Sequence, residues 1–180
     1  MANWCSNVLR VYGSDEDIKT FDRKFKGFPA RTADAVGEER PKIRKYCFNA
    51  LYPLPKNQRE NWYDWSIEHW SVKWDVWGDV QKVDTATDKE LEYFFETPWC
   101  PPENWLQHVS SNFPRLTFEI TYWEFNCNFA GRTRYQDGIV TDEQNRTNDD
   151  ARDLLEAVGY VEEWEDLQEC IKEAENAEDN

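Results

Sequence analysis

The chain has 180 residues, a net charge of −15 at pH 7 and ten tryptophans. This length suits one domain, and no apolar run approaches the ~20 residues of a membrane-spanning helix, which argues against an integral membrane protein. The strong acidity disfavours direct binding to nucleic acids and membrane surfaces, because both carry negative charge.

The first part of the chain predicts a strand, a helix and a long connection. A strand is expected at residues 8–12. Residues 14–27 place apolar side chains on one face of a helical period, which predicts an amphipathic helix. Residues 29–45 are polar and show no apolar period, so we expect a loop insertion there.

Five tryptophans fall within the next segment: Trp62, Trp65, Trp70, Trp74 and Trp77. Their spacing fits both strand and helix. We expect a short helix before Trp70, then an extended or irregular segment, with most of the rings in the core. A nucleic-acid stacking platform is disfavoured because it needs a cationic groove.

The second half alternates strands with one helix. Residues 91–97 predict an aromatic strand, and prolines then precede a helix at about residues 102–113. Residues 116–125 predict a half-buried strand, with a hairpin partner at 129–140. The succession β-α-β-β-α-β predicts an α+β protein, namely an elaborated ferredoxin-like antiparallel sheet backed by helices.

The acidity is concentrated at the C-terminal end. Residues 141–180 contain fifteen acidic and three basic residues, a net charge of −12, which leaves −3 for residues 1–140. Two helices are expected here, and the second has one strongly acidic face: Glu162, Glu163, Glu165, Asp166, Glu169 and Glu173. We therefore divide the chain into a core domain, 1–140, and an acidic helical appendage, 141–180.

Four local motifs occur together: NWCSN at 3–7, KWD at 73–75, TPWCPP at 97–102 and EFNCNFAG at 124–131. In combination they resemble the YubB / Api92-like family, whose members carry a ferredoxin-like domain and are encoded by plasmids and bacteriophages. The resemblance covers about residues 1–140 and leaves the acidic segment outside. Ser71 and Val72 stand where the family favours Gly-Thr. The resemblance implies a fold but supplies no activity.

These motifs contain aromatic and charged residues suited to a ligand pocket: Trp4, Lys73, Trp74, Asp75, Trp99 and Glu124. The rings would stack on a nucleotide or another flat ligand, with Lys73 on a phosphate. The competing interpretation is a closed set of rings in which Lys73 pairs with Asp75 or Glu124. We favour the closed arrangement.

Neither metal nor catalytic motifs are apparent. The five cysteines are widely spaced without CxxC pairs, and the chain has two histidines, His69 and His108. We therefore expect no metal and no cofactor. With no export signal, we expect reduced thiols and a cytoplasmic protein. A cysteine nucleophile would need a histidine nearby, so an enzyme using Cys or Glu is only the third alternative.

The acidic helix face has two interpretations. It is either a solvated surface or an array of carboxylates that imitates a phosphate backbone and occupies the basic groove of a partner. Our leading hypothesis is a non-enzymatic phage or plasmid accessory protein that inhibits a basic host protein, such as a nuclease or a nucleic-acid-guided defence complex. The alternative is a nucleotide or small-ligand binding module with an aromatic pocket. The oligomeric state stays open.

Overall fold

The computed structural model describes residues 3–30, 43–83, 85 and 87–178. The strands are β1 (Trp4–Tyr12), β2 (Lys26–Gly27), β3 (Lys45–Tyr46), β4 (Trp77–Val83), β5 (Glu90–Pro98), β6 (Thr117–Glu124), β7 (Phe129–Gln136) and β8 (Ile139–Arg146). The helices are α1 (Asp15–Phe25), α2 (Trp62–Trp70), α3 (Glu103–Asn112), α4 (Arg152–Val158) and α5 (Val161–Glu178).

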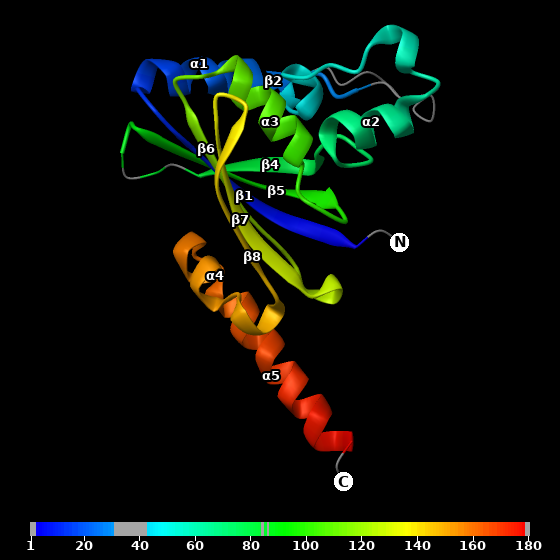
Figure 1. Ribbon diagram of the computed structural model, residues 1–180, viewed down its shortest axis with the longest axis vertical. Coiled ribbons are helices and arrows are strands. Elements are labelled where there is room, and N and C mark those ends of the chain that lie inside the picture. Colours follow the sequence, from blue (N-terminus) through cyan, green and yellow to red (C-terminus); the bar gives the residue numbers. More distant parts are fainter. Residues whose placement is uncertain (1–2, 31–42, 84, 86, 179–180) are drawn as a thin grey trace.

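Six of the strands form one antiparallel sheet in the order β4-β5-β1-β6-β7-β8 (Figure 1). The succession β1-α1-β4-β5-α3-β6 with the order β4-β5-β1-β6 is the ferredoxin-like arrangement. The hairpin β7-β8 widens this sheet beyond β6. The predicted α+β class and ferredoxin-like sheet are therefore confirmed.

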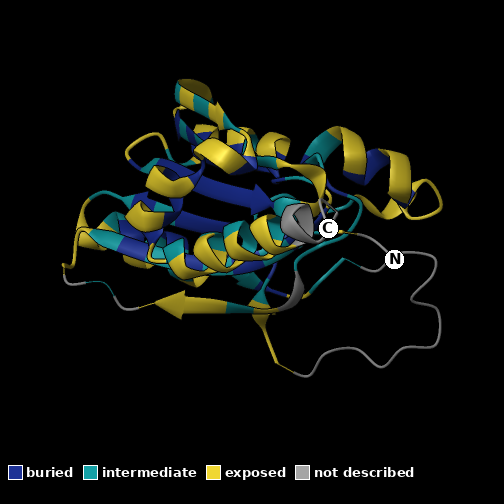
Figure 2. Ribbon diagram, turned by 90° about the horizontal axis from the view of Figure 1, so that it is seen from below, coloured by how far each residue is buried: buried dark blue, intermediate teal, exposed yellow. Residues whose placement is uncertain are grey.

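The main core lies between one face of the sheet and helices α1, α2 and α3. Its members include the fully buried Leu9, Phe21, Tyr93, Trp105 and Phe118. The rings meet mostly edge to face, as in Phe21 against Phe118, whose centroids are 5.2 Å apart. Figure 2 shows the buried strands of this sheet between helices whose outer sides are exposed.

Helix α1 begins where its capping residue predicts. The Ser14 side chain accepts the backbone N–H of Asp17, which satisfies one unpaired donor of the first turn. The helix ends at Phe25, two residues before the predicted end, and β2 follows. At Gly27 an added Cβ would lie 2.7 Å from the Ala50 side chain, so a residue without a side chain is required there.

The tryptophan-rich segment divides at Ser71. Helix α2 ends there because Ser71 adopts a left-handed conformation with φ of 67°. The residues between Ser71 and β4 are irregular, as expected. Trp62, Trp65 and Trp70 are buried, which confirms the core interpretation for these three rings. The side chain of Trp77 is not among those that the structure describes.

The opposite face of the sheet carries a second, smaller core. Leu155 and Val158 of α4 pack here with Val8 and Trp123 of the sheet, and Trp164 of α5 joins them. Helix α5 then runs past the sheet (Figure 1). Strand β8 crosses the division at 140/141, so the sheet extends into the acidic segment as far as Arg146.

Two further expectations concern the loop insertion at residues 29–45 and a membrane-spanning helix. Residues 31–42 of the expected loop insertion lie outside the described residues. Among the helices that are described, none combines the length and apolar character needed to cross a bilayer.

Candidate functional site: an aromatic corner around Lys73

Three of the four sequence motifs lie at one end of the sheet. Trp4, at the start of β1, pairs with Pro98 at the end of β5. The backbone N–H of Trp99 donates to the carbonyl oxygen of Asn3 at 2.9 Å. The side-chain amide of Asn3 in turn donates to Sγ of Cys127 at 3.2 Å. Segments 3–7, 97–102 and 124–131 therefore meet at one corner of the fold.

The fourth motif brings a positive charge to the same corner. Nζ of Lys73 lies 4.1 Å from the centroid of the Trp74 ring, 5.8 Å from that of Trp99 and 5.7 Å from that of Tyr63. The Trp4 ring stacks on Trp74 with 6.3 Å between centroids. These five residues form what we call the aromatic corner. An ammonium at such distances is attracted by the negative ring faces.

The aromatic corner is partly open to solvent. Tyr63 is 43% exposed and Trp99 is 42% exposed, whereas Trp4, Lys73 and Trp74 are partly buried. Within the described chain, no ion pair joins Lys73 to a carboxylate. The closed arrangement that we favoured, with Lys73 paired to Asp75 or Glu124, was therefore wrong. Ring faces hold the ammonium because both carboxylates are engaged elsewhere.

Asp75 is engaged by the backbone. Its carboxylate accepts the N–H groups of Ala30, Phe48, Asn49 and Val76, at 2.5 to 3.3 Å. Burial raises the pKa of the Asp75 carboxyl, and the four amides offset part of that increase. Asp75 therefore fastens neighbouring segments together and is not available to a ligand.

Glu124 is engaged by its own turn. It is 3% exposed, and its Oε1 accepts both the backbone and the side-chain N–H of Asn126. Burial opposes ionisation of this carboxyl, but hydrogen bonds from Cys127 and Asn126 lower its pKa below the usual value. Its Oε2 is buried and has no hydrogen-bond partner within the described chain. Within the described chain, Glu124 is linked to the aromatic corner through Cys127 and Asn3.

Trp99 has an unusual backbone. Its φ is +70°, a left-handed conformation that bulky residues rarely adopt. Buried polar contacts hold the turn beside it: Asn7 Nδ2 donates to Thr97 Oγ1 at 2.9 Å, and Thr97 Oγ1 donates to the carbonyl oxygen of Cys100 at 2.7 Å. The ring of Trp99 is therefore held partly in solvent by a fixed turn.

Four of the five thiols are poorly suited to nucleophilic chemistry. Burial raises the pKa values of Cys5, Cys47 and Cys100, that of Cys47 to about 12. A hydrogen bond with Glu124 raises the pKa of Cys127. A raised pKa keeps a thiol protonated, and the thiolate is the nucleophile. Among the described residues, no group of three His, Cys, Asp or Glu could hold a metal ion.

The two histidines meet between α2 and α3, which the sequence did not indicate. The ring of His108 stacks on Tyr52 with 3.6 Å between centroids, and His69 meets the edge of Tyr52 at 5.6 Å. They line a shallow hollow of about 290 Å³ together with Glu68. Burial and the nearby His69 lower the pKa of His108. The described contacts of these histidines include no cysteine.

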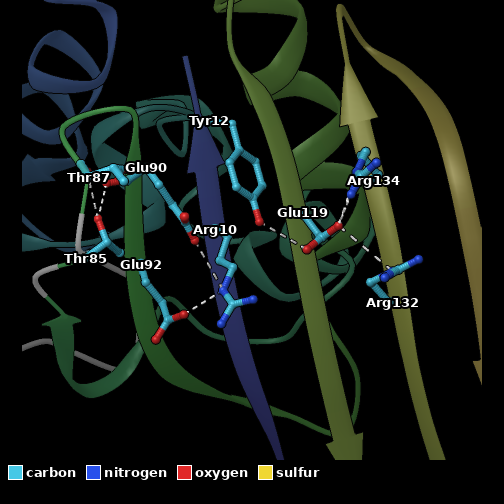
Figure 3. Close-up of polar contacts among 9 residues, drawn as sticks. All are labelled: Arg10, Tyr12, Thr85, Thr87, Glu90, Glu92, Glu119, Arg132 and Arg134. Atoms are coloured by element: carbon cyan, nitrogen blue, oxygen red, sulfur yellow. Dashed lines mark hydrogen bonds and ion pairs between the residues drawn. The ribbon is translucent and has the colours of Figure 1, made fainter. Parts of the chain in front are cut away.

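The sequence also did not indicate a charged network on the face of the sheet that carries the second core (Figure 3). Arg10 pairs with Glu92 at 2.6 Å, and Arg132 with Asp142 at 3.0 Å. The buried Glu119 accepts from Tyr12 at 3.3 Å and pairs with Arg134. Charged residues within otherwise uncharged stretches of β1, β6 and β7 were the available signal. Because these charges neutralise one another, we regard the network as structural.

The acidic face of α5 is exposed. All six carboxylate side chains named from the sequence are in solvent. Glu163 accepts the Trp123 indole N–H at 3.2 Å, and Glu165 pairs with Arg152 at 3.2 Å. These two contacts fasten the start of α5 to the second core. The rest of the acidic row follows the helix beyond the sheet.

A family model described as a ferredoxin-like domain in Api92-like protein matches residues 73–172, more than half of the chain. The chain belongs to this Api92-like family. The match begins at Lys73, inside the aromatic corner, and ends at Lys172 within α5. The expectation that the acidic segment lies outside the family resemblance was therefore wrong.

Two individual relatives agree with this family. The uncharacterised protein YubB of Escherichia coli (strain K12) is 35% identical over 80 residues, which are 44% of this chain and 54% of YubB. The matched region thus spans about half the length of that curated relative. The crystal structure of protein api92 from Yersinia pseudotuberculosis superposes with a TM-score of 0.64, over 80% of this chain and 98% of that one. Since their identity is 9%, this likeness concerns the fold alone.

Proposed function

We propose that this protein is a non-enzymatic binding module whose aromatic corner takes a small flat ligand. The observation that carries the proposal is the placement of Lys73 among Tyr63, Trp74 and Trp99, with two of these rings more than two-fifths exposed. Flat rings beside a fixed charge are the usual lining of a site for planar ligands.

The surrounding structure supports this proposal. Stability alone does not explain why these rings are held partly in solvent. Only the buried part of an aromatic side chain adds to hydrophobic stabilisation. The segments that carry the corner are anchored by buried polar contacts at Asp75 and Thr97. A binding site gains affinity when its lining is fixed before the ligand arrives.

Ligand binding is testable by tryptophan fluorescence. Nucleotides, aromatic carboxylates and quaternary ammonium compounds would be titrated into the full chain. We expect saturable quenching by one class, which is lost in Trp99→Asn and kept in Ile139→Ala, a change at an exposed apolar residue of β8. If none of the three classes changes the fluorescence saturably, the small-ligand proposal is wrong.

A second candidate function uses the acidic face of α5. In this proposal the chain is a phage or plasmid accessory protein that inhibits a basic host protein, such as a nuclease or a nucleic-acid-guided defence complex. The exposure of all six carboxylates on a helix that runs past the sheet favours it. Closely spaced carboxylates resemble a phosphate backbone to a basic groove.

This second candidate predicts a salt-dependent interaction. A partner captured from host lysate would be purified and its affinity measured at low and high ionic strength. Exposed charges are screened over about 8 Å at physiological salt, so affinity should fall steeply as salt rises. Changing Glu162, Glu163, Glu165 and Asp166 to Lys should weaken binding at low salt. Unchanged affinity and unchanged salt dependence in this variant would rule out the acidic face.

A further inference from the structure

We infer that the ligand of the aromatic corner is a planar ring bearing an anionic group, as in a nucleoside monophosphate. Its ring stacks on Trp99, and Lys73 passes from the ring faces to the anion on binding. This inference rests on the proposed small-ligand function and adds the chemical class of the ligand and the roles of two residues.

The Lys73 ammonium is held without its strongest kind of partner. Ring faces attract the charge but do not satisfy three N–H donors as well as anionic oxygens do. Its ring contacts span 4.1 to 5.8 Å, and no described carboxylate pairs with it. A phosphate beside the corner would offer charge-assisted hydrogen bonds, which are shorter and stronger. Lys73 therefore carries a positive charge that is positioned to bind an anionic group of a ligand.

Trp99 carries two unfavourable features at once. Its backbone is left-handed at φ +70°, and its ring is 42% exposed. Strained conformations cluster at binding sites, where the surrounding structure enforces them. A large ring that is neither relaxed nor fully buried is positioned to stack on something outside the chain. We therefore assign Trp99 as the stacking residue.

The charges distinguish between classes of ligand. The corner already holds one cation, so a second cation would be repelled by Lys73. A neutral ring would leave Lys73 on Trp74 and gain only stacking. A nucleic-acid polymer would bring many phosphates towards a chain of net charge −15, whereas a monophosphate brings one or two charges. A single ring with a single anionic group fits best.

The test compares matched ligands by calorimetric titration of the full chain. The probes are the four ribonucleoside 5′-monophosphates, the corresponding nucleosides, choline and a short single-stranded oligonucleotide. We expect at least one monophosphate to bind on the order of tenfold more tightly than its nucleoside, through the charge of Lys73. Lys73→Met should remove that difference, and Lys56→Met, a change at an exposed lysine, should keep it.

Stacking is tested separately at Trp99. Trp99→Asn and Trp99→Gly both tolerate a left-handed backbone, so at least one should fold with an unchanged melting temperature. Each should weaken the monophosphate and its nucleoside by about the same factor, on the order of tenfold. Equal binding of monophosphate and nucleoside by the wild type, or tighter binding of choline or the oligonucleotide, would overturn the inference. Quenching by another ligand class would then still leave the proposed small-ligand function standing.

Discussion

Nζ of Lys73 lies 4.1 Å from the centroid of the ring of its neighbour in sequence, Trp74. Adjacent residues on a regular strand point to opposite faces, so this contact depends on the irregular backbone between α2 and β4. The same irregular segment turns Asp75 into the fold and leaves Lys73 at the surface. One short stretch thus supplies both a structural anchor and a candidate binding charge.

The contact between Lys73 and the rings should contribute modestly to stability. We expect Lys73→Met to lower the free energy of unfolding by about 0.5–2 kcal/mol, the range for partly desolvated cation–π contacts. Urea denaturation measures this change. Lys56→Met is the matched control and should have no effect beyond about 0.5 kcal/mol. Equal effects of the two variants would show that the rings do not hold Lys73.

Trp99 should show the opposite behaviour. Glycine relieves the left-handed strain, which costs bulky residues roughly 1–2 kcal/mol, while the lost ring contacts offset part of the gain. We expect Trp99→Gly to leave the free energy of unfolding unchanged or about 1 kcal/mol higher. Trp105→Ala, at a fully buried ring, should instead cost about 3–5 kcal/mol. A comparable loss at Trp99 would mean that its ring is part of the core.

Asp75 should be among the most sensitive polar positions. Asp75→Ala leaves four backbone N–H groups without their acceptor, and each buried donor so stranded costs about 1–3 kcal/mol. We expect a fall in melting temperature far larger than for Asp79→Ala, a change at an exposed carboxylate. Asp75→Asn keeps one acceptor oxygen and should lie between the two. Equal melting temperatures for Asp75→Ala and Asp79→Ala would contradict this role.

Stability should depend on pH through His108. Burial and the nearby His69 lower its pKa in the folded state below the unfolded value of about 6.5. Below pH 6.5 the unfolded chain therefore binds more protons at this site, and stability falls as the pH falls towards the folded pKa. Melting temperatures between pH 7.5 and 5 measure this loss.

Substitutions identify the groups responsible for that loss. His108→Gln should flatten the dependence of stability on pH between the folded and unfolded pKa values of His108. His69→Gln should reduce that dependence in part. The exposed Glu68 lies 3.9 Å from Nδ1 of His69 and lines the same hollow as His108, so Glu68→Gln should steepen the loss by removing a nearby negative charge that favours protonation. A slope that persists unchanged in His108→Gln would assign the pH dependence to other groups.

The strand and helix periods were sufficient to predict the fold class. The apolar stripe of α1 and the alternation along β6 depend on local geometry, which sequence patterns report directly. Strand β8 was less visible, because its residues are polar and it lies at the sheet edge with one neighbour. Charge suggested a boundary at 140/141, but the sheet continued because β7 offered an unpaired edge.

The candidate site was predictable in its members but not in its geometry. Trp4, Lys73, Trp74 and Trp99 were named from the motifs, and the fold brings them together. The sequence could not show which acceptor each charged group would find. The Asp75 carboxylate accepts hydrogen bonds from backbone amides, and the Glu124 carboxylate accepts them from Asn126 in its own turn. Among the described contacts, the Lys73 ammonium therefore lies against aromatic rings. Tyr63 was missed because its approach depends on the left-handed turn that ends α2 at Ser71.

The most direct test of the aromatic corner is the proton chemical shift of the Lys73 side chain, measured by NMR. Because the ammonium lies over ring faces, its ε-methylene protons should resonate upfield of those of an exposed lysine such as Lys56. Saturating nucleoside monophosphate should move them back towards the exposed value, and the nucleoside alone should not. Lysine protons at the ordinary shift in the free protein, or protons that stay upfield with bound monophosphate, would contradict the account.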